Sequence, residues 1–230
     1  MVYKKRLDGR KYDELRPITA EVGMLKNADG SAVYQQGGTK MMAAVFGPKT
    51  LHPQRLRDAE KGVLRVYYRM FPFSVFDRKN PRPSRREIEI SMVIRNALEP
   101  VIFLEEFANA AIDVYVYVMQ GDAGTRTAAI CAASLALADA GIPMKDLVSS
   151  TSAGLIDGQE LLDLTYDEEA FDGEVSDIPI AYTELLEEVT LLQMDGRADQ
   201  DKLIKALELG VKGCLDIKKI LIQTLKKKYE

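Results

Sequence analysis

Residues 112–140 hold the feature that most constrains the fold: an alternating segment, a glycine-bearing turn and a run of small apolar residues, in that order. Apolar side chains at every second position of residues 112–118 predict a strand with one buried face. The run at 128–140 predicts a buried helix, and Gly121-Asp122-Ala123-Gly124 predicts the turn between the two. The helix is therefore expected to start directly at the glycine turn.

The start of that helix is a candidate anion-binding site. The N–H groups of a first helical turn have no partner within the helix, and the helix dipole favours negative charge beside them. Arg126 adds a permanently charged, planar group that suits phosphate. The same residues also fit a plain turn with one surface arginine, and the pattern alone leaves both interpretations open. No Gly-Lys-Ser/Thr closes the turn and the third glycine of the dinucleotide fingerprint is missing, so neither common nucleotide loop is present.

Charge is distributed unevenly along this chain of net charge -4. Residues 49–86 contain eleven Lys or Arg and three acids, whereas residues 157–201 contain fifteen acids and a single base, Arg197. A basic block within an acidic protein favours a local site for a polyanion. A solvated basic loop beside an acidic neighbour is the alternative.

Composition excludes several mechanisms and compartments. His52 is the only histidine, so two-histidine ribonuclease catalysis and a zinc site of several histidines are excluded within one chain. With only Cys131 and Cys214, neither a disulfide framework nor a cysteine metal site is expected. The sequence contains no run of about 18 apolar residues, so it predicts no transmembrane helix. The charged first 16 residues lack the apolar core of a signal peptide. We therefore expect no membrane association and a cytoplasmic protein.

Periodicity along the rest of the chain predicts both strands and helices. A hairpin is expected at 31–46 about Gly37-Gly38. Residues 64–70 alternate, which places Arg65 and Arg69 on a face that suits single-stranded nucleic acid or simply solvent. Further strands are expected at 147–156, 161–165, 177–182 and 189–194, and a final helix from about Asp199 with Leu203, Leu207, Val211, Leu215 and Leu221 inward. This order predicts an α+β fold with a mixed β-sheet and packed helices.

A further helix is expected after Ser84, because Ser84 and Glu87 form a capping box. Its first turn carries Arg85 and Arg86, although cations there oppose the helix dipole at a cost of about 0.3–1 kcal/mol each. An anion bound at this helix start would reverse the sign of that effect, so the pair indicates function; two solvated arginines are the alternative. The predicted inward stripe is Ile88, Met92, Arg95, Leu98 and Ile102.

Motifs spread over nearly the whole chain resemble the ribonuclease PH family. In chain order they are Arg16-Pro17-Ile18, Glu21-Val22-Gly23, Ala28-Asp29-Gly30-Ser31-Ala32, Gly37-Gly38-Thr39, Phe46-Gly47-Pro48, Met70-Phe71-Pro72-Phe73-Ser74, Arg85-Arg86-Glu87-Ile88-Glu89-Ile90 and Gly124-Thr125-Arg126-Thr127-Ala128. Within the family, the double arginine and the Met-Phe-Pro-Phe-Ser run are most similar to the catalytic ring subunits of archaeal exosomes.

The resemblance implies a ribosomal protein S5 domain 2-like fold, as one domain over 1–230 with an N-terminal extension at 1–15 and a C-terminal helix at 199–230. It implies a phosphate-dependent 3′→5′ exoribonuclease that degrades single-stranded RNA to nucleoside diphosphates and, because the reaction is reversible, can add 3′ tails. It also implies partners: a homologous inactive ribonuclease PH-like subunit in a hexameric ring, a trimer of heterodimers, and RNA-binding cap proteins.

The resemblance further implies roles for particular residues. Gly124, Thr125 and Arg126 would bind the attacking phosphate. Arg85 and Arg86 would hold the RNA backbone, with Arg86 also near the phosphate, and Arg65 and Arg69 would be further RNA contacts. Asp177 would bind Mg²⁺ (or Mn²⁺) or act as general acid toward the leaving 3′ oxygen.

One departure from the family's pattern concerns the second acid of the site. Phe171 stands where a second aspartate is expected, six residues before Asp177, and Asp172 is the nearest acid. We therefore predict Asp172 as the second catalytic and metal-binding residue, with Asp167, Glu168 and Glu169 as further candidates.

Two alternative functions remain at this point. A ring subunit that binds RNA without cleaving it is the first, although such subunits usually lack the arginines retained here. A small-molecule kinase of related fold is the second, but the glycine- and serine-rich ATP loop that it needs is not seen in the sequence.

Overall fold

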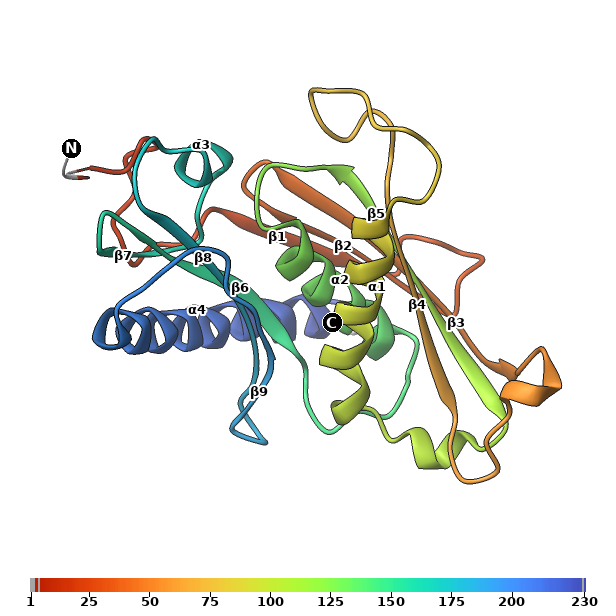
Figure 1. Cartoon of the computed structure of the whole chain (residues 1–230). Coiled ribbons are helices and arrows are strands. Elements are labelled where there is room, and N and C mark those ends of the chain that lie inside the picture. The colour runs from red at the N-terminus through yellow and green to blue at the C-terminus, as the bar shows by residue number, and fades with distance from the viewer. Residues whose placement is uncertain (1–2, 4, 229) are drawn as a thin grey trace.

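The computed structural model describes residue 3, residues 5–228 and residue 230. In this part of the chain the strands form two sheets (Figure 1). The first sheet has the order β1-β2-β3-β5-β4 and contains β1 (Ile18–Val22), β2 (Gly30–Gln36), β3 (Thr39–Thr50), β4 (Val63–Met70) and β5 (Ala110–Gln120). The second has the order β7-β6-β8-β9 and contains β6 (Ser149–Ile156), β7 (Gln159–Leu162), β8 (Val175–Thr183) and β9 (Glu188–Leu192).

The helices are α1 (Arg85–Leu98), α2 (Thr125–Asp139), α3 (Tyr166–Glu169) and α4 (Gln200–Lys226), and short 3-10 turns occupy Gln54–Leu56, Glu99–Val101 and Leu104–Phe107. α2 contacts β2, β3 and β5 on one side and β6 and β8 on the other, so it lies between the two sheets (Figure 1). Small residues permit this close approach: a Cβ at Gly30 of β2 would lie 2.3 Å from the Ala140 nitrogen. The main hydrophobic core accordingly runs without a break from the first sheet through α2 to the second.

The structure confirms the predicted strand, glycine turn and buried helix at 112–140 as β5 followed by α2. It also confirms the predicted hairpin, since β2 and β3 are antiparallel and Gln36 pairs with Thr39 across Gly37-Gly38. β4 runs parallel to β5 whereas the other pairs of the first sheet are antiparallel, so the sheet is mixed, as predicted.

The inward face predicted for α1 was correct at its end and wrong at its start. Leu98 and, just beyond the helix, Ile102 are buried as predicted. Ile88 and Met92 are 61% and 51% exposed, and the helix instead buries Ile90 and Ile94. The cause is Glu87, whose carboxylate accepts hydrogen bonds from the Ser84 nitrogen at 2.6 Å and from the Met70 nitrogen of β4 at 2.8 Å. These two bonds fix the rotation of α1 about its axis. That rotation, rather than the apolar pattern of the helix, determines which of its residues face the core.

The inward face of α4 also differs from the predicted one. Leu221 is buried as expected, but the most buried residues of the stripe are Ala206, Gly210, Cys214 and Ile217. A Cβ at Gly210 would lie 2.9 Å from the Ile180 side chain of β8, so the small residues determine which face approaches the sheet. Packing density therefore prevails over the leucine pattern here.

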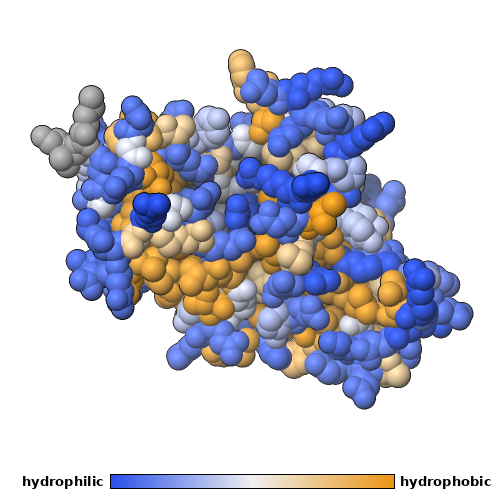
Figure 2. Space-filling model, in the orientation of Figure 1, coloured by the Kyte–Doolittle hydropathy of each residue, from blue (hydrophilic) through white to orange (hydrophobic). Residues whose placement is uncertain are grey.

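One face of the first sheet, opposite α1, carries partly exposed aromatic side chains. Tyr67 stacks on Tyr115 with ring centroids 5.0 Å apart, and Phe71 stacks on Tyr117 at 5.2 Å. On the face of the molecule seen in Figure 2, hydrophobic residues gather over α4 near β9, whereas hydrophilic residues surround the start of α1. Among the described residues, no helix is long and apolar enough to cross a membrane.

Candidate active site

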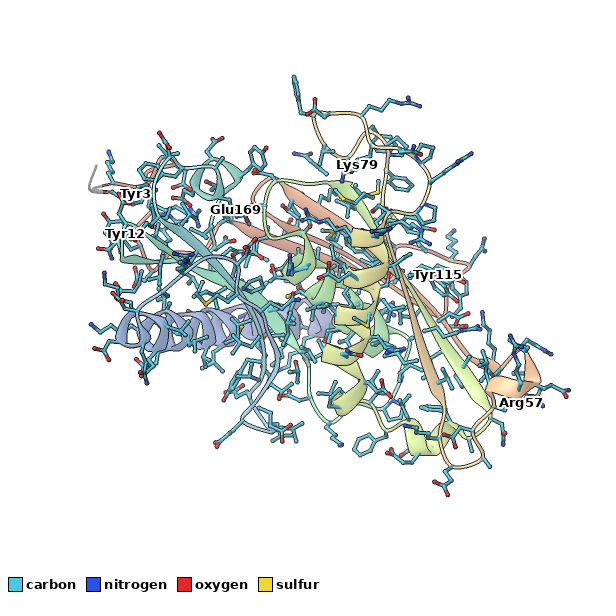
Figure 3. All side chains as sticks on the ribbon, viewed as in Figure 1. Tyr3, Tyr12, Arg57, Lys79, Tyr115 and Glu169 are labelled. Atoms are coloured by element: carbon cyan, nitrogen blue, oxygen red, sulfur yellow. The ribbon has the colours of Figure 1, made fainter. Side chains whose placement is uncertain are left out.

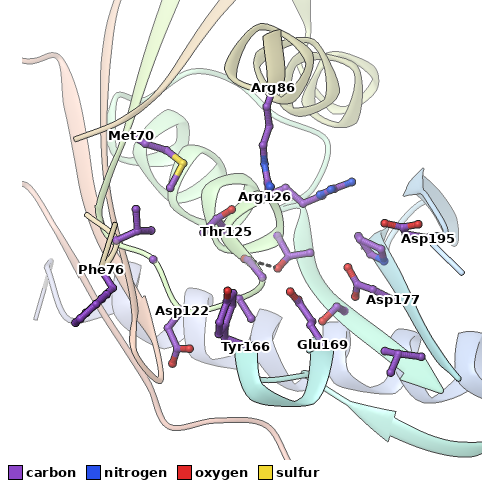
Figure 4. Close-up of a pocket in the computed structure, with 18 of the residues that line it drawn as sticks. Met70, Phe76, Arg86, Asp122, Thr125, Arg126, Tyr166, Glu169, Asp177 and Asp195 are labelled. Atoms are coloured by element: carbon purple, nitrogen blue, oxygen red, sulfur yellow. Dashed lines mark hydrogen bonds between the residues drawn. The ribbon is translucent and has the colours of Figure 1, made fainter. Parts of the chain in front are cut away.

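A cavity of about 920 Å³ lies where the start of α2 meets the second sheet (Figure 4). The glycine turn before α2 forms its floor, and the remaining walls come from the loop before α1, from α3 and from β8. Lys79 and Glu169 line it from the loop before α1 and from the end of α3 (Figure 3). The cavity thus collects side chains that are more than 90 residues apart in sequence.

The glycine turn presents the free N-terminal end of α2 to the cavity. Gly124 is the N-cap residue in the left-handed region, with φ 60°, and among the described residues no side chain caps the helix. Thr39 fixes the turn from behind, because its hydroxyl donates to the Asp122 and Ala123 carbonyls at 2.7 and 2.6 Å. A helix of 15 residues that starts uncapped at a cavity leaves its N–H groups and dipole available to an anion.

Arg16 supports the same turn from the buried side. Its Nη1 donates to the Asp122 carbonyl at 2.5 Å, while its Nη2 donates to Asp163 Oδ1 at 2.7 Å. A Cβ at Gly124 would lie 3.2 Å from Arg16 Nη2. The lack of a side chain at Gly124 therefore lets the glycine turn rest directly on a buried guanidinium.

Two arginines reach the cavity from different helices. Arg126 projects from the first turn of α2, and Arg86 from the first turn of α1, so that their side chains lie beside each other (Figure 4). Gln193, which follows β9, holds Arg126 by accepting a hydrogen bond from its Nη1. Neither arginine forms an ion pair with a carboxylate in the part of the chain that the structure describes. Both positive charges remain available for an anionic ligand.

Two carboxyl groups face these arginines from the second sheet and α3. Burial and, to a smaller extent, Asp195 raise the pKa of Asp177 to about 6, against the opposing charge of Arg126. Burial and the neighbouring Asp177 raise the pKa of Glu169 to about 7. Glu169 is exposed as a whole residue, and its side chain lies near Asp177 at the cavity (Figure 4). A pair of carboxyl groups with raised pKa values in a cavity is a common sign of a functional site.

Buried polar atoms near this pair form no well-aligned hydrogen bond. Asp177 Oδ1 and the Ser152 hydroxyl are both buried without such a bond among the described residues, although Ser152 is close enough to lower the pKa of Asp177. The Tyr68 hydroxyl is likewise buried without a well-aligned bond; burial raises its pKa, while the neighbouring Thr125 hydroxyl and the charge of Arg86 oppose the rise. Unsatisfied groups of this kind are rare in folded proteins and indicate a bound ligand or ordered water.

The carboxyl pair is suited to a magnesium ion. Among the described residues there is no cluster of three or more metal-binding side chains. Mg²⁺ does not need one, because it keeps several waters and usually binds one or two carboxylates together with substrate phosphates. The unpartnered Asp177 oxygen beside Glu169 fits that arrangement.

The cavity brings together most of the site residues expected from the sequence. Gly124, Thr125, Arg126, Arg86 and Asp177 all line it. The alternation of β4 places Arg65 and Arg69 elsewhere.

Arg65 and Arg69 lie on the opposite face of the first sheet because Tyr68, between them in β4, faces the core. Arg65 is bound to Asp113 at 2.5 Å, and Arg69 donates to the Tyr68 carbonyl at 3.0 Å. Arg85 is exposed at the start of α1 and does not line the cavity.

The candidates for the second acid occupy different places in the structure. Asp172 is exposed in the turn after α3 and does not line the cavity, whereas Glu169 does. The reason is the capping box of Thr165 and Glu168, which winds residues 166–169 into one helical turn and leaves Asp172 beyond it. Glu168 is itself buried against Arg6 at 2.8 Å and is not available to a ligand. The Thr165-x-x-Glu168 pattern in the sequence is the local signal for this helical turn, which turns Glu169, one of the further candidates, toward the cavity.

Comparisons with known proteins agree with this geometry. Residues 14–143 match the model of the 3′ exoribonuclease family, domain 1, and residues 146–213 match domain 2 of the same family. The exosome complex component Rrp41 of Thermococcus kodakarensis is 53% identical over 98% of this chain and 90% of its own length. Rrp41 of Nitrosopumilus maritimus is 48% identical over 98% of this chain and 91% of its own.

A solved structure shares the fold as well. The crystal structure of rice (Oryza sativa) Rrp46 matches with a TM-score of 0.83 and 27% identity, over 96% of this chain and 100% of that chain. The matches confirm the predicted α+β fold and the predicted phosphorolytic 3′→5′ exoribonuclease activity. The chain belongs to the ribonuclease PH family of 3′ exoribonucleases.

Proposed function

We propose that this protein is the catalytic subunit of an exosome ring, in which it degrades single-stranded RNA from the 3′ end with inorganic phosphate as the attacking group. The observation that carries the proposal is the convergence of Arg86 and Arg126 beside the unpartnered carboxylate oxygen of Asp177. A hydrolytic nucleophile is not needed, because phosphate itself attacks the last phosphodiester.

The reaction requires two anions to be held against their mutual repulsion. Arg126 and the N-terminal N–H groups at Gly124 and Thr125 would bind inorganic phosphate, and Arg86 would hold the scissile phosphodiester beside it. A phosphate oxygen then bonds to the terminal phosphorus as the bond to the 3′ oxygen breaks. The products are a nucleoside diphosphate and RNA shortened by one nucleotide with a free 3′ hydroxyl. The arginines contribute by positioning and by stabilising the charge that develops at phosphorus.

The carboxyl pair would serve the leaving 3′ oxygen. With its pKa near 6, the Asp177 carboxyl is protonated in a useful fraction of molecules near neutral pH and can donate its proton there. When ionised, Asp177 and Glu169 would hold Mg²⁺ or Mn²⁺, which would supply positive charge at the reacting phosphate. Glu169 takes the place that the sequence suggested for Asp172, because only Glu169 lines the cavity.

The remaining arginines are proposed as outer contacts. Arg85 lies one residue from Arg86 at the start of α1 and would meet RNA on its way into the cavity. Arg65 and Arg69 face the other side of the first sheet, so RNA that they touch would lie outside the cavity.

The assembly is proposed from the relatives, whose names describe exosome components. We propose a hexameric ring that alternates this chain with a homologous inactive subunit, covered by RNA-binding cap proteins. We place the complex in the cytoplasm, since Cys131 and Cys214 are both free and buried, as is usual in a reducing compartment. A non-catalytic RNA-binding subunit of the same ring is the second candidate, and the two unpaired arginines of the cavity count against it.

The test uses 5′-labelled single-stranded RNA and Mg²⁺, with and without phosphate, and the full chain alone or with a homologous ring subunit. We expect phosphate-dependent shortening from the 3′ end with release of nucleoside diphosphates. Arg126→Ala and Asp177→Asn should each lower the rate by about 10²–10³-fold, whereas Arg95→Ala, on the exposed side of α1, should not. RNA binding without shortening in every preparation would favour the non-catalytic subunit instead.

A further inference from the structure

Two aromatic side chains stand exposed at the cavity. Phe76 is 106% exposed and Tyr166 is 64% exposed, yet both line the cavity that holds Arg86 and Arg126. Phe76 comes from the loop between β4 and α1, and Tyr166 is the first residue of α3 (Figure 4). The two rings therefore belong to different walls of one site.

Neither ring is used within the described fold. The other exposed aromatic residue of the same loop, Phe73, has a ring partner: it is 71% exposed and stacks on Phe71 with centroids 5.1 Å apart. Phe76 and Tyr166 stack on no ring among the described residues. Their apolar faces are exposed to solvent beside the cavity in which we propose that phosphate groups bind.

Both rings are held on anchored segments. The loop is tied on either side of Phe76, because the Ser74 carbonyl accepts from Gly121 at 2.7 Å and the Lys79 nitrogen donates to Pro72 at 3.0 Å. Tyr166 starts a helical turn that is fixed by the buried pair of Glu168 and Arg6. Less conformational freedom is lost on binding when the contact groups are already placed in this way.

We infer that Phe76 and Tyr166 form a base-stacking subsite for the nucleotides at the 3′ end of single-stranded RNA. This inference rests on the proposed function, which places the terminal phosphates at Arg86 and Arg126. RNA whose phosphates lay against the arginines would have its bases within the same cavity, which Phe76 and Tyr166 line with exposed rings. Every base has a π-face, so stacking there grips RNA without reading its sequence, as a processive exonuclease requires.

The chain offers a direct optical test because it contains no tryptophan. Phe76→Trp and Tyr166→Trp each introduce a single indole at the subsite. Leu185→Trp is the matched control, because Leu185 is 71% exposed between β8 and β9 and does not line the cavity. Emission would be followed during titration with single-stranded RNA, with an abasic ribose-phosphate oligomer of equal length and with inorganic phosphate.

We expect RNA to quench the Phe76→Trp and Tyr166→Trp proteins while the abasic oligomer and phosphate quench neither, and the Leu185→Trp protein to respond to none of the three. In parallel, Phe76→Ala and Tyr166→Ala should each weaken RNA binding by about 5- to 150-fold, the range for loss of one stacked base. They should raise the KM for RNA far more than the KM for phosphate. Both side chains are exposed, so thermal unfolding should remain near that of the parent protein and report that the variants fold.

Several outcomes would overturn the inference. Equal quenching by the abasic oligomer would assign the response to the sugar-phosphate backbone. Emission changes caused by a homologous ring subunit, with none caused by RNA, would assign the rings to a protein interface. RNA that binds by fluorescence anisotropy and is shortened without quenching would reject stacking and leave the proposed function intact. Failure of both RNA binding and phosphorolysis would reject the two proposals together.

Discussion

Arg16 and Asp163 form a buried ion pair that supports the glycine turn before α2. Arg16 Nη2 and Nε donate to the two carboxylate oxygens of Asp163 at 2.7 and 2.9 Å, and the remaining Nη1 reaches the Asp122 carbonyl. Asp163 lies just before α3, whose residues include Tyr166 and Glu169. One guanidinium thus connects the turn before α2 to the segment that places Glu169 at the cavity.

Arg16→Ala should destabilise the protein and loosen the glycine turn before α2. The substitution removes the two side-chain hydrogen bonds to the buried Asp163 carboxylate and leaves it only the backbone nitrogen of position 16 and Arg10 at 3.5 Å. Loss of the main partner of a buried ion pair costs up to about 3–5 kcal/mol of unfolding free energy. Arg16→Lys keeps the charge but lacks the planar fork, so we expect an intermediate loss and a raised KM for phosphate. Denaturant unfolding and phosphate-dependent kinetics measure the two effects, with the exposed Arg95→Lys as control. An unchanged KM in a folded Arg16→Lys protein would show that the turn holds its shape without Arg16.

Acid should destabilise the protein through Asp163. Burial alone would raise the pKa of this carboxyl, but the hydrogen bonds and charge of Arg16 lower it below its ordinary 3.8. A lowered pKa in the folded state adds stability that is present above about pH 4 and is lost as the pH falls through the lowered value. Between pH 6 and pH 2, the Tm of the parent protein should therefore fall more than that of Asp163→Asn. Parallel curves of Tm against pH for the two proteins would show that the ion pair of Arg16 and Asp163 makes no pH-dependent contribution to stability.

Glu169→Gln should lower activity, whereas Asp172→Asn should not. Both substitutions remove one acid from the same acidic segment, but only Glu169 lines the cavity beside Asp177. We expect a loss of about 10²-fold or more for Glu169→Gln in phosphorolysis with Mg²⁺, and a rate for Asp172→Asn within about two-fold of the parent. Removal of metal with a chelator should lower the rate of the parent protein and should have less effect on the residual rate of the Glu169→Gln protein. The opposite ranking of the two variants would restore Asp172 as the second acid.

Arg65→Ala and Arg86→Ala should affect different properties. Arg65 faces away from the cavity and pairs with the buried Asp113, so its loss should act chiefly on stability. Arg86 lines the cavity, and loss of one phosphate contact should reduce the slope of log affinity against log salt by about 0.7 for single-stranded RNA. Salt titrations of RNA binding for both variants, with Arg69→Ala as a second residue of the outer face, separate the effects. If Arg65→Ala reduced the slope of log affinity against log salt as much as Arg86→Ala does, RNA would also follow the outer face of the first sheet.

Local sequence patterns predicted much of the secondary structure. The glycine turn before α2, the hairpin at Gly37-Gly38 and the capping box at Ser84 each depend on residues close together in the chain, and each formed where it was expected. The inward faces of α1 and α4 were less predictable, because they depend on Glu87 reaching β4 and on small residues of α4 meeting β8. Those partners are distant in sequence, and periodicity within one helix does not contain them.

The sequence by itself determined the chemistry of this protein: arginines at two helix starts, a glycine turn able to receive phosphate, and a family resemblance carried by short motifs. Only the tertiary structure decided which of those groups meet. Packing of α2 between the two sheets brings Arg126 beside Arg86 and Asp177, and the one-turn helix α3 brings Glu169 rather than Asp172 into the cavity. The physical reason is that side-chain type and local turns are fixed by neighbouring residues, whereas distances between segments are set by burial and packing of the whole chain.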